Sequence, residues 1–295
     1  MSGLKGLPKM QTSQPSTRAV LILGMHRSGT SAFARGMQAL GVYLGTNMLA
    51  TRPDNPTGYW EDQTICELNE RLLAVFGLKW TDPAPIETDW NEPSVESLRS
   101  AAAEYLQSHF VEQRLWGFKD PRTVRVLPFW QSVMRSLQVD ESYIVAIRNP
   151  LSVAASLLQR QGMDSVTAHK LWLAYMVPYL DRVAKHHFVV ADYDLLMAEP
   201  QPQLERIACS LDIPVDEQTR NALRSFGDNF LDPRLRHNLF SELDFDPVHN
   251  LTPLAREAYL WLRQLATDQT AHDSSRFWLA WQRSRDAVEQ LLSNH

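Results

Sequence analysis

The chain has 295 residues, which is enough to bury a sizeable core as one large domain or two small ones. Its formal net charge of -5 argues against a general binder of nucleic acid or of anionic membranes, although a local basic pocket is still compatible with it. The two cysteines, Cys66 and Cys209, are far apart and form no CxxC pair, so we predict two reduced core thiols rather than a disulfide or a metal site.

Neither the N-terminal region nor any apolar run of the sequence predicts a membrane-spanning segment. No apolar run approaches the ~18 residues that a bilayer-spanning helix needs. Residues 1–18 lack the apolar stretch of an export signal and are predicted to form a flexible tail. We therefore expect a cytoplasmic protein with no integral membrane segment.

The first predicted elements are a strand, a glycine-containing loop and a helix. Ala19–Leu23 is a short apolar run that ends at a glycine, which is typical of a strand buried on both faces. Further along, Phe33, Met37 and Leu40 recur at helical spacing, and Gly41 predicts the end of that helix. This order of elements opens an α/β unit.

Three more strands are predicted, each followed by polar residues. They cover Trp116–Asp120, Tyr143–Ile147 and His187–Ala191. Helical stretches lie between them, and Asn149 is predicted to cap a helix that begins at Pro150. Strands that alternate with helices indicate an α/β fold with a mostly parallel sheet covered on both faces. Ligands bind beyond the carboxyl ends of such strands, where these polar residues lie.

The C-terminal part of the chain is predicted to be helical. From about Ser241 onward the sequence is rich in tryptophan and has a helical pattern. No linker-like stretch precedes it, so we expect residues 241–295 to form a helical cover on the sheet. Residues 19–295 are therefore predicted to form one domain.

The segment Gly24–Ser31, with the sequence GMHRSGTS, is predicted to bind an anion. Gly24 and Gly29 have the spacing of a triphosphatase loop, G-x-x-x-x-G-K-[ST], but Thr30 stands at the lysine position. Backbone amides and a helix N-terminus still favour a phosphate, whereas the arrangement of Lys, Mg²⁺ and triphosphate is lost. Arg27 supplies positive charge within the loop, and its guanidinium can contact a phosphate and a transferring group together.

A second phosphate site is predicted in the segment Ile147–Ser156, with the sequence IRNPLSVAAS. Arg148 follows the end of a predicted strand, and Ser156 lies about two turns into the next helix. The alternative interpretation is an exposed arginine and a serine that bonds its own helix backbone. Together with the glycine loop, the pair predicts a second phosphate at the same edge of the sheet.

These motifs resemble the sulfotransferases that use 3′-phosphoadenosine-5′-phosphosulfate (PAPS) as donor. GMHRSGTS is similar to the family's 5′-phosphosulfate loop, and Arg148 with Ser156 is similar to its 3′-phosphate pair. The resemblance covers roughly Ala19 to Phe240. Further segments that resemble bacterial members are GYWED (Gly58–Asp62), GFKDPR (Gly117–Arg122), DYDLL (Asp192–Leu196) and FLDPRLRH (Phe230–His237).

The resemblance implies a P-loop-like three-layer fold and a PAPS-dependent transferase that needs no metal. PAPS is the expected co-substrate and leaves as 3′-phosphoadenosine-5′-phosphate (PAP). The residues expected to bind this nucleotide are His26, Arg27, Ser28, Gly29, Thr30, Ser31, Arg148, Ser156 and Arg236.

Sulfuryl transfer requires positioning and stabilisation of charge, as phosphoryl transfer does. Arg27 is predicted to stabilise the leaving oxygen, and the resemblance places Lys119 beside the moving sulfonate. A carboxylate within hydrogen-bond reach would accept the proton of the acceptor hydroxyl. The resemblance to carbohydrate-directed and tyrosine-directed members makes Glu61 the leading candidate, followed by Asp62 and Asp120.

Other polar residues receive weaker predictions. His26 either contacts substrate or packs beside the first strand, and a structural role is favoured. His186 and His187 have neither HExxH spacing nor cysteine partners, so no metal site is expected. Trp80 or Tyr59 is a candidate for the wall of the adenine or acceptor pocket.

Three hypotheses of different classes follow. The first is transfer of sulfonate from PAPS to a hydroxyl of a small molecule or glycan, with a carbohydrate or glycolipid as the expected acceptor. The second is a P-loop kinase or phosphatase, which would need Mg²⁺ and a lysine at Thr30. The third is a non-catalytic nucleotide-binding module. No nucleic-acid partner is expected, and the oligomeric state stays open.

Overall fold

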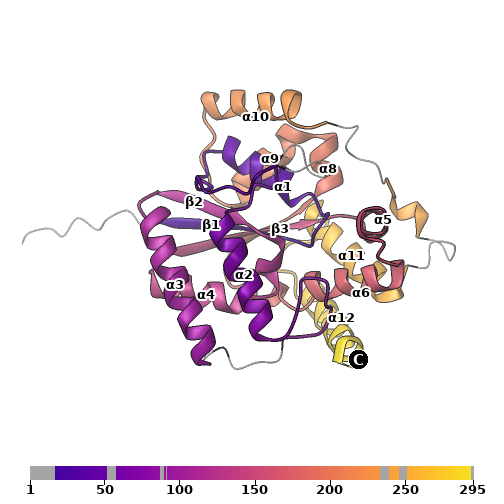
Figure 1. The fold of residues 1–295 in the computed structure, drawn as a ribbon. Coiled ribbons are helices and arrows are strands. Elements are labelled where there is room, and N and C mark those ends of the chain that lie inside the picture. Colours follow the sequence, from indigo (N-terminus) through magenta and orange to yellow (C-terminus); the bar gives the residue numbers. More distant parts are fainter. Residues whose placement is uncertain are drawn as a thin grey trace, which may run out of the picture.

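The computed structural model describes residues 17–51, 58–86, 90, 92–232, 239–245 and 251–293. Within these ranges a central parallel sheet lies between two layers of helices (Figure 1). The strands are β1 (Arg18–Leu23), β2 (Leu115–Lys119), β3 (Asp140–Ile147) and β4 (His187–Asp192). The helices before β3 are α1 (Thr30–Ala39), α2 (Gln63–Val75), α3 (Pro93–His109), the 3₁₀ turn η1 (Pro121–Val124) and α4 (Leu127–Ser136).

The remaining helices follow β3 and fill both layers. They are α5 (Pro150–Gln161), α6 (Ser165–Met176), α7 (Leu180–Val183), α8 (Tyr193–Ala198), α9 (Pro200–Ser210), α10 (Glu217–Asn229), the 3₁₀ turn η3 (Glu242–Asp244), α11 (Pro253–Ala266) and α12 (Ser275–Ser293). No helix of the described ranges is both long and apolar enough to cross a membrane.

The strand order β2-β1-β3-β4 creates a crevice at the carboxyl ends of the strands. All neighbouring strands are parallel, and the register aligns Ile22 with Lys119 and Leu23 with Val145. The chain continues from β1 to β2 on one side and then crosses to β3 on the other side of β1. Loops that leave β1 and β3 therefore diverge, and ligands bind at such a switch point in open α/β sheets.

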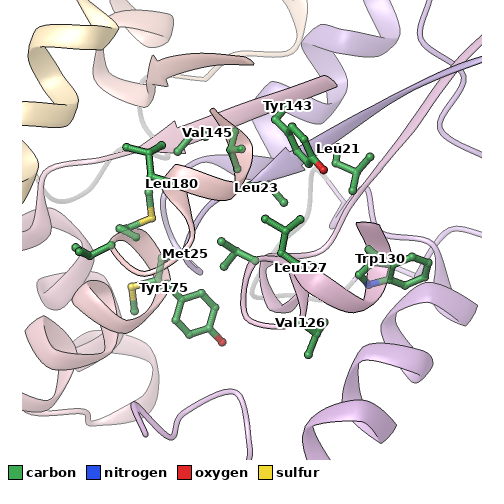
Figure 2. Close-up of a cluster of buried hydrophobic side chains, with 14 of the residues drawn as sticks. Leu21, Leu23, Met25, Val126, Leu127, Trp130, Tyr143, Val145, Tyr175 and Leu180 are labelled. Carbon is green, nitrogen blue, oxygen red and sulfur yellow. The ribbon is translucent and has the colours of Figure 1, made fainter. Parts of the chain in front are cut away.

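Alternate residues of β1 serve two separate cores. Leu21 and Leu23 face one side, where they meet Tyr143 and Val145 of β3 and the aromatic ring of Trp130 (Figure 2). Each apolar side chain that is fully buried in this way contributes roughly 1.5–3 kcal/mol. Val20 and Ile22 face the other side. The strand is apolar throughout because both of its faces are covered.

Each face of the sheet has its own set of helices. Buried residues of α2, α3, α4, α6, α11 and α12 join the first core, whereas those of α1, α8, α9 and α10 join the second. The two sets lie on opposite sides of the sheet in Figure 1. The predicted α/β class, the parallel sheet and the helical C-terminal cover are thus confirmed.

The predicted elements agree with the structure apart from their ends. β1 begins at Arg18 rather than Ala19, and β3 begins at Asp140 rather than Tyr143. The side-chain oxygen of Asn149 caps α5 by accepting a hydrogen bond from the amide of Leu151 at 2.9 Å. Residues 1–16 lie outside the described ranges. The predicted N-terminal tail and the predicted division into domains therefore stay predictions.

One sequence prediction about the cysteines is wrong. Both cysteines are free thiols, but only Cys66 is buried, whereas Cys209 is exposed on α9. Cys209 lies on the outer side of a helix whose buried face is formed by Leu204, Ile207 and Ala208. Sequence distance alone had suggested two core thiols, and the phase of α9 decides otherwise.

Candidate functional site

The glycine loop lies between β1 and α1, at the crevice between β1 and β3. Gly24 has a φ of 151°, and a Cβ there would lie 2.6 Å from the carbonyl oxygen of Ala146 on the neighbouring strand. Gly29 has a φ of 76°, and a Cβ there would lie 2.0 Å from Cδ2 of Tyr193. The two glycines are therefore required by backbone conformation and by close packing.

The N-terminus of α1 opens directly from this loop. The first amides of a helix have no intrahelical carbonyl partner, and they carry the positive end of the helix dipole. No acidic residue stands in the first turn of α1, and its N-cap Gly29 has no side chain to satisfy these amides. This end of α1 therefore suits a phosphate, as the sequence predicted.

Arg27 and the second predicted phosphate site form one continuous group. Nε of Arg27 donates to Oγ of Ser156 at 2.9 Å, and the guanidinium of Arg148 donates to the carbonyl oxygen of Arg27 at 3.2 Å. The side chain of Arg27 is thus directed toward Ser156 in this structure. Its φ of 71° is unusual for a residue other than glycine and is held by these tertiary contacts.

Tyr193 is a residue of this site that the sequence did not single out. It begins α8 directly after β4, so it lies at the same edge of the sheet as the glycine loop. Its ring lies 4.9 Å from the guanidinium carbon of Arg148 and packs closely on Gly29. Its position after a strand within DYDLL was the available signal. Tyr193 orients Arg148 through a cation–π contact.

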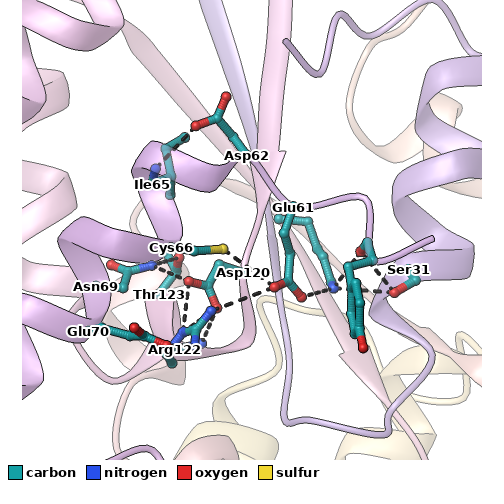
Figure 3. A network of polar contacts seen from close by, with 12 residues as sticks. Ser31, Glu61, Asp62, Ile65, Cys66, Asn69, Glu70, Asp120, Arg122 and Thr123 are labelled. Carbon is teal, nitrogen blue, oxygen red and sulfur yellow. Dashed lines mark hydrogen bonds and ion pairs between the residues drawn. The ribbon is translucent and has the colours of Figure 1, made fainter. Parts of the chain in front are cut away.

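Lys119 and Glu61 form a buried ion pair next to α1. Nζ of Lys119 also donates to the carbonyl oxygen of Tyr59 at 2.9 Å and to Oγ of Ser31 at 3.2 Å. Lys119 ends β2, Glu61 precedes α2 and Ser31 belongs to the first turn of α1. Figure 3 shows Ser31 and Glu61 facing the same ammonium group. The predicted catalytic lysine and carboxylate therefore lie together beside the N-terminus of α1.

The other two candidate carboxylates have structural contacts. Asp62 caps α2 through the amide of Ile65 at 3.1 Å and accepts from the hydroxyl of Tyr105 at 2.8 Å. Burial raises the pKa of Asp62. Asp120 is fully buried and pairs with Arg122 at 3.0 Å. Of the three predicted bases, Glu61 is therefore the one in contact with Lys119.

His26 has a packed environment behind the loop. Its ring centroid lies 4.3 Å from that of Trp80 and 5.8 Å from that of Tyr175. Burial, followed by the positive charges of Arg122, Lys119 and Arg27, lowers the pKa of His26 well below its ordinary value. A neutral imidazole at this position agrees with the favoured structural role. Trp80 contacts the glycine loop through the ring of His26.

Three potential metal ligands lie close together, but cations of the chain already engage them. One ligand atom each of Glu61, Cys66 and Asp120 lies within 4.8 Å of the others. Lys119 and Arg122 pair with the two carboxylates. Burial raises the pKa of the Cys66 thiol, which disfavours the thiolate that a metal would need.

The remaining predicted residues lie elsewhere or outside the described ranges. Nε2 of His186 lies 3.2 Å from Glu141, and Nδ1 of His187 lies 3.3 Å from Asp212, at the opposite end of the sheet from the loop. The two histidines thus have separate carboxylate partners. Arg236 lies outside the described residues, so its predicted contact with the 3′-phosphate stays a prediction.

The fold and the loop define an α/β protein whose glycine loop and first helix N-terminus lie at a topological switch point. The sequence profile of the Sulfotransferase family matches residues 19–217, which is more than half of the chain. The chain therefore belongs to the sulfotransferase family and is a sulfotransferase enzyme. No curated protein matches it in sequence.

Three solved structures from bacteria are similar to the chain. The sulfotransferase domain from the Synechococcus PCC 7002 olefin synthase is 20% identical, with 96% of this chain and 98% of that chain covered and a TM-score of 0.43. Sulfotransferase STF9 from Mycobacterium avium is 16% identical, with 72% and 68% covered and a TM-score of 0.41. Sulfotransferase STF1 from Mycobacterium tuberculosis H37Rv is 13% identical, with 75% of each chain covered and a TM-score of 0.40.

Proposed function

We propose that this protein transfers the sulfonate group of PAPS to an acceptor hydroxyl on a carbohydrate or glycolipid. The observation that supports the proposal best is the convergence of two groups at one edge of the sheet. One group consists of the side chains of Arg27 and Arg148 with the hydroxyl of Ser156, and the other is the buried pair of Lys119 and Glu61. The first suits a nucleotide with two phosphates, and the second suits proton and charge transfer.

The donor would bind across the β1–β3 crevice. Its 5′-phosphosulfate would lie on the amides at the start of α1, and its 3′-phosphate would bind Arg148 and Ser156. Because Ser156 accepts a hydrogen bond from Arg27 in the structure, the 3′-phosphate would take the place of Arg27 at that hydroxyl. Arg27 would then turn toward the bridging oxygen of the 5′-phosphosulfate. This exchange would couple occupation of one phosphate subsite to formation of the other.

The transfer itself would be an in-line displacement at sulfur. A bond forms between the acceptor oxygen and sulfur while the bond from sulfur to the bridging phosphate oxygen breaks, and its electron pair leaves with PAP. Arg27 and Lys119 would stabilise the charge that develops on the leaving oxygen and on the sulfonate. Glu61 would accept the proton of the acceptor hydroxyl. Two side-chain cations, Arg27 and Lys119, would thus supply the positive charge, so we propose a metal-independent reaction.

The acceptor class and the cellular location belong to the same proposal. The carbohydrate-directed and tyrosine-directed enzymes that the chain resembles have a glutamate in the region of Glu61. Phenol-directed enzymes have a histidine near the position of Lys119-Asp120-Pro121, and its replacement here supports a carbohydrate acceptor. The low cysteine content supports a cytoplasmic location. Transfer of radiolabelled sulfonate from PAPS to a panel of sugars and phenols would test the acceptor class, since labelled phenols alone would contradict it.

Calorimetric titration with PAP in EDTA, with ATP and Mg²⁺ titrated in parallel, tests the nucleotide. We expect PAP to bind with micromolar affinity without metal, because two separate cationic subsites match its two phosphates. ATP should bind weakly, because it has no 3′-phosphate for Arg148 and Ser156. Tight binding of ATP with Mg²⁺ and no signal from PAP would contradict the proposal and favour a kinase.

A further inference from the structure

Arg122 lies behind the Lys119–Glu61 pair and joins it to a buried polar network (Figure 3). It belongs to η1, the 3₁₀ turn that follows β2, and its side chain is only 10% exposed. The chemistry described above makes no use of this arginine. A buried guanidinium with its fixed fork of donors nevertheless restricts the orientation of a carboxylate beside it.

Asp120 and Asn69 hold the guanidinium of Arg122 in place. Nε of Arg122 lies 3.0 Å from both carboxylate oxygens of Asp120, which also accepts from Nδ2 of Asn69 at 2.8 Å. Asn69 in turn accepts a hydrogen bond from the indole of Trp130 at 2.7 Å. Asp120 and Asn69 are fully buried. The guanidinium therefore has little freedom to rotate.

The NH2 nitrogen of the Arg122 guanidinium faces Glu61. NH2 of Arg122 lies 3.6 Å from Oε2 of Glu61, and the thiol of Cys66 donates to the same oxygen at 3.4 Å. The other oxygen, Oε1, faces Lys119. Glu61 is thus held on both sides, with one oxygen assigned to the network and the other to the ammonium group.

We propose that Arg122 is a positioning residue that holds Oε2 of Glu61 and thereby orients Oε1 on Lys119. This inference rests on the proposed function, in which Glu61 is the base. The groups that contact Glu61 are Lys119 at the end of β2, Arg122 from η1 and Cys66 from α2. Without Arg122, Oε2 keeps only the weak hydrogen bond from the Cys66 thiol, so the carboxylate can turn away from Lys119.

The test compares wild type with Arg122→Gln, Arg122→Lys and Glu70→Gln. Glu70 is the matched control, because its exposed carboxylate pairs with NH1 of Arg122 at 2.8 Å on the solvent side, away from Glu61. Two readouts are measured: kcat separately from KM for the acceptor, and the position of the Glu61 carboxylate relative to Lys119 in a crystal structure of each variant.

Arg122→Gln should lower kcat by about tenfold with the acceptor KM and PAP affinity unchanged, because a misplaced catalytic carboxylate costs rate rather than binding. In its crystal structure Oε1 of Glu61 should have left Lys119. Arg122→Lys should restore kcat in part, because it keeps a cation beside Oε2. Glu70→Gln should leave both readouts at wild-type values. If Arg122→Gln fails to fold, the double variant Asp120→Asn/Arg122→Gln removes the buried charge on both sides and takes its place.

A folded variant without Arg122 that keeps the wild-type kcat and the contact of Glu61 with Lys119 would overturn the inference. The crystal structures do not depend on turnover. Absence of sulfonate transfer in wild type would therefore contradict the proposed function, while a displaced Glu61 carboxylate in Arg122→Gln would still show that Arg122 positions it.

Discussion

At the scale of single residues, the site consists of cations that contact groups far away in the sequence. Arg27 reaches Ser156 across 129 positions, and Lys119 reaches Glu61 across 58 positions. Each contact joins the end of one strand to a different helix or loop. A single substitution can therefore remove one chemical role while the hydrophobic layers around it stay intact.

Arg27→Ala should abolish sulfonate transfer and leave the fold unchanged. Its guanidinium is proposed to stabilise the leaving oxygen, and its side chain belongs to neither hydrophobic core. Turnover with saturating PAPS and circular dichroism would be measured together. Arg148→Ala is the matched comparison, and it should weaken PAP binding by roughly 10-fold or more through loss of a charged hydrogen bond. Wild-type turnover of Arg27→Ala would show that the mechanism is wrong.

Glu61→Gln should reduce turnover by about 100-fold or more, because an amide cannot accept the proton of the acceptor hydroxyl. PAP affinity should stay near that of wild type, since Glu61 contacts Lys119 rather than the cluster proposed for the 3′-phosphate. Single-turnover kinetics at saturating donor would measure the effect. A near-normal rate would assign the base to another group, and Asp62→Asn and Asp120→Asn would then be compared.

At the scale of elements, the strand–loop–helix unit depends on a glycine that touches α8. The Cβ of any other residue at Gly29 would overlap the ring of Tyr193, which packs on Arg148. The loop, the start of α1 and the start of α8 are thus fitted to one another. Changes here should affect stability and donor binding together.

Gly29→Ala should lower the free energy of unfolding by about 1–3 kcal/mol more than Gly41→Ala. Both glycines have positive φ, 76° and 87°, so the backbone cost is shared, but a Cβ at Gly41 meets nothing within 4 Å. Gly29→Ala should also weaken PAP binding, because Tyr193 must move. Urea denaturation and calorimetry on both variants would measure this. Equal stabilities would mean that the ring moves aside at no cost.

At the scale of the whole molecule, the sheet separates a reactive edge from a structural one. The carboxyl ends of the strands carry the cationic groups, whereas the start of β3 carries the half-buried Glu141. Burial raises the pKa of Glu141 to about 7. Its neighbour His186 has a lowered pKa through burial and through Arg135 and Lys185. At neutral pH His186 therefore provides little positive charge to hold Glu141 ionised.

This carboxyl should make global stability depend on pH. The folded pKa lies above the unfolded value near 4.5, so the contribution of Glu141 is fully present below about pH 4.5 and is lost as pH rises through about 7. Glu141→Gln should flatten the fall in unfolding midpoint between these values. Asp140→Asn, at the exposed neighbour on the same strand, should leave the slope unchanged. A slope that persists in Glu141→Gln would assign it to another group.

The fold, the glycine loop and the polar residues at the strand ends were predicted from local sequence patterns. Ala19–Leu23 is apolar because both faces of β1 are covered, and that pattern is legible without neighbours. The glycines of the loop and the cap at Asn149 satisfy local backbone demands, so their residue types reveal them. The strand ends then indicated which polar residues share an edge, since parallel strands end together.

Contacts between distant segments decided the rest. The sequence left Glu61, Asp62 and Asp120 as alternative bases, and only the packing of α2 against α3 and η1 places Asp62 on Tyr105 and Asp120 on Asn69. The phase of α9 exposes Cys209, which composition had suggested was buried. Residue type and spacing therefore determined the strands, the glycine loop and the family. The tertiary structure decided which charged groups pair, because long-range packing sets their distances and their exposure to water.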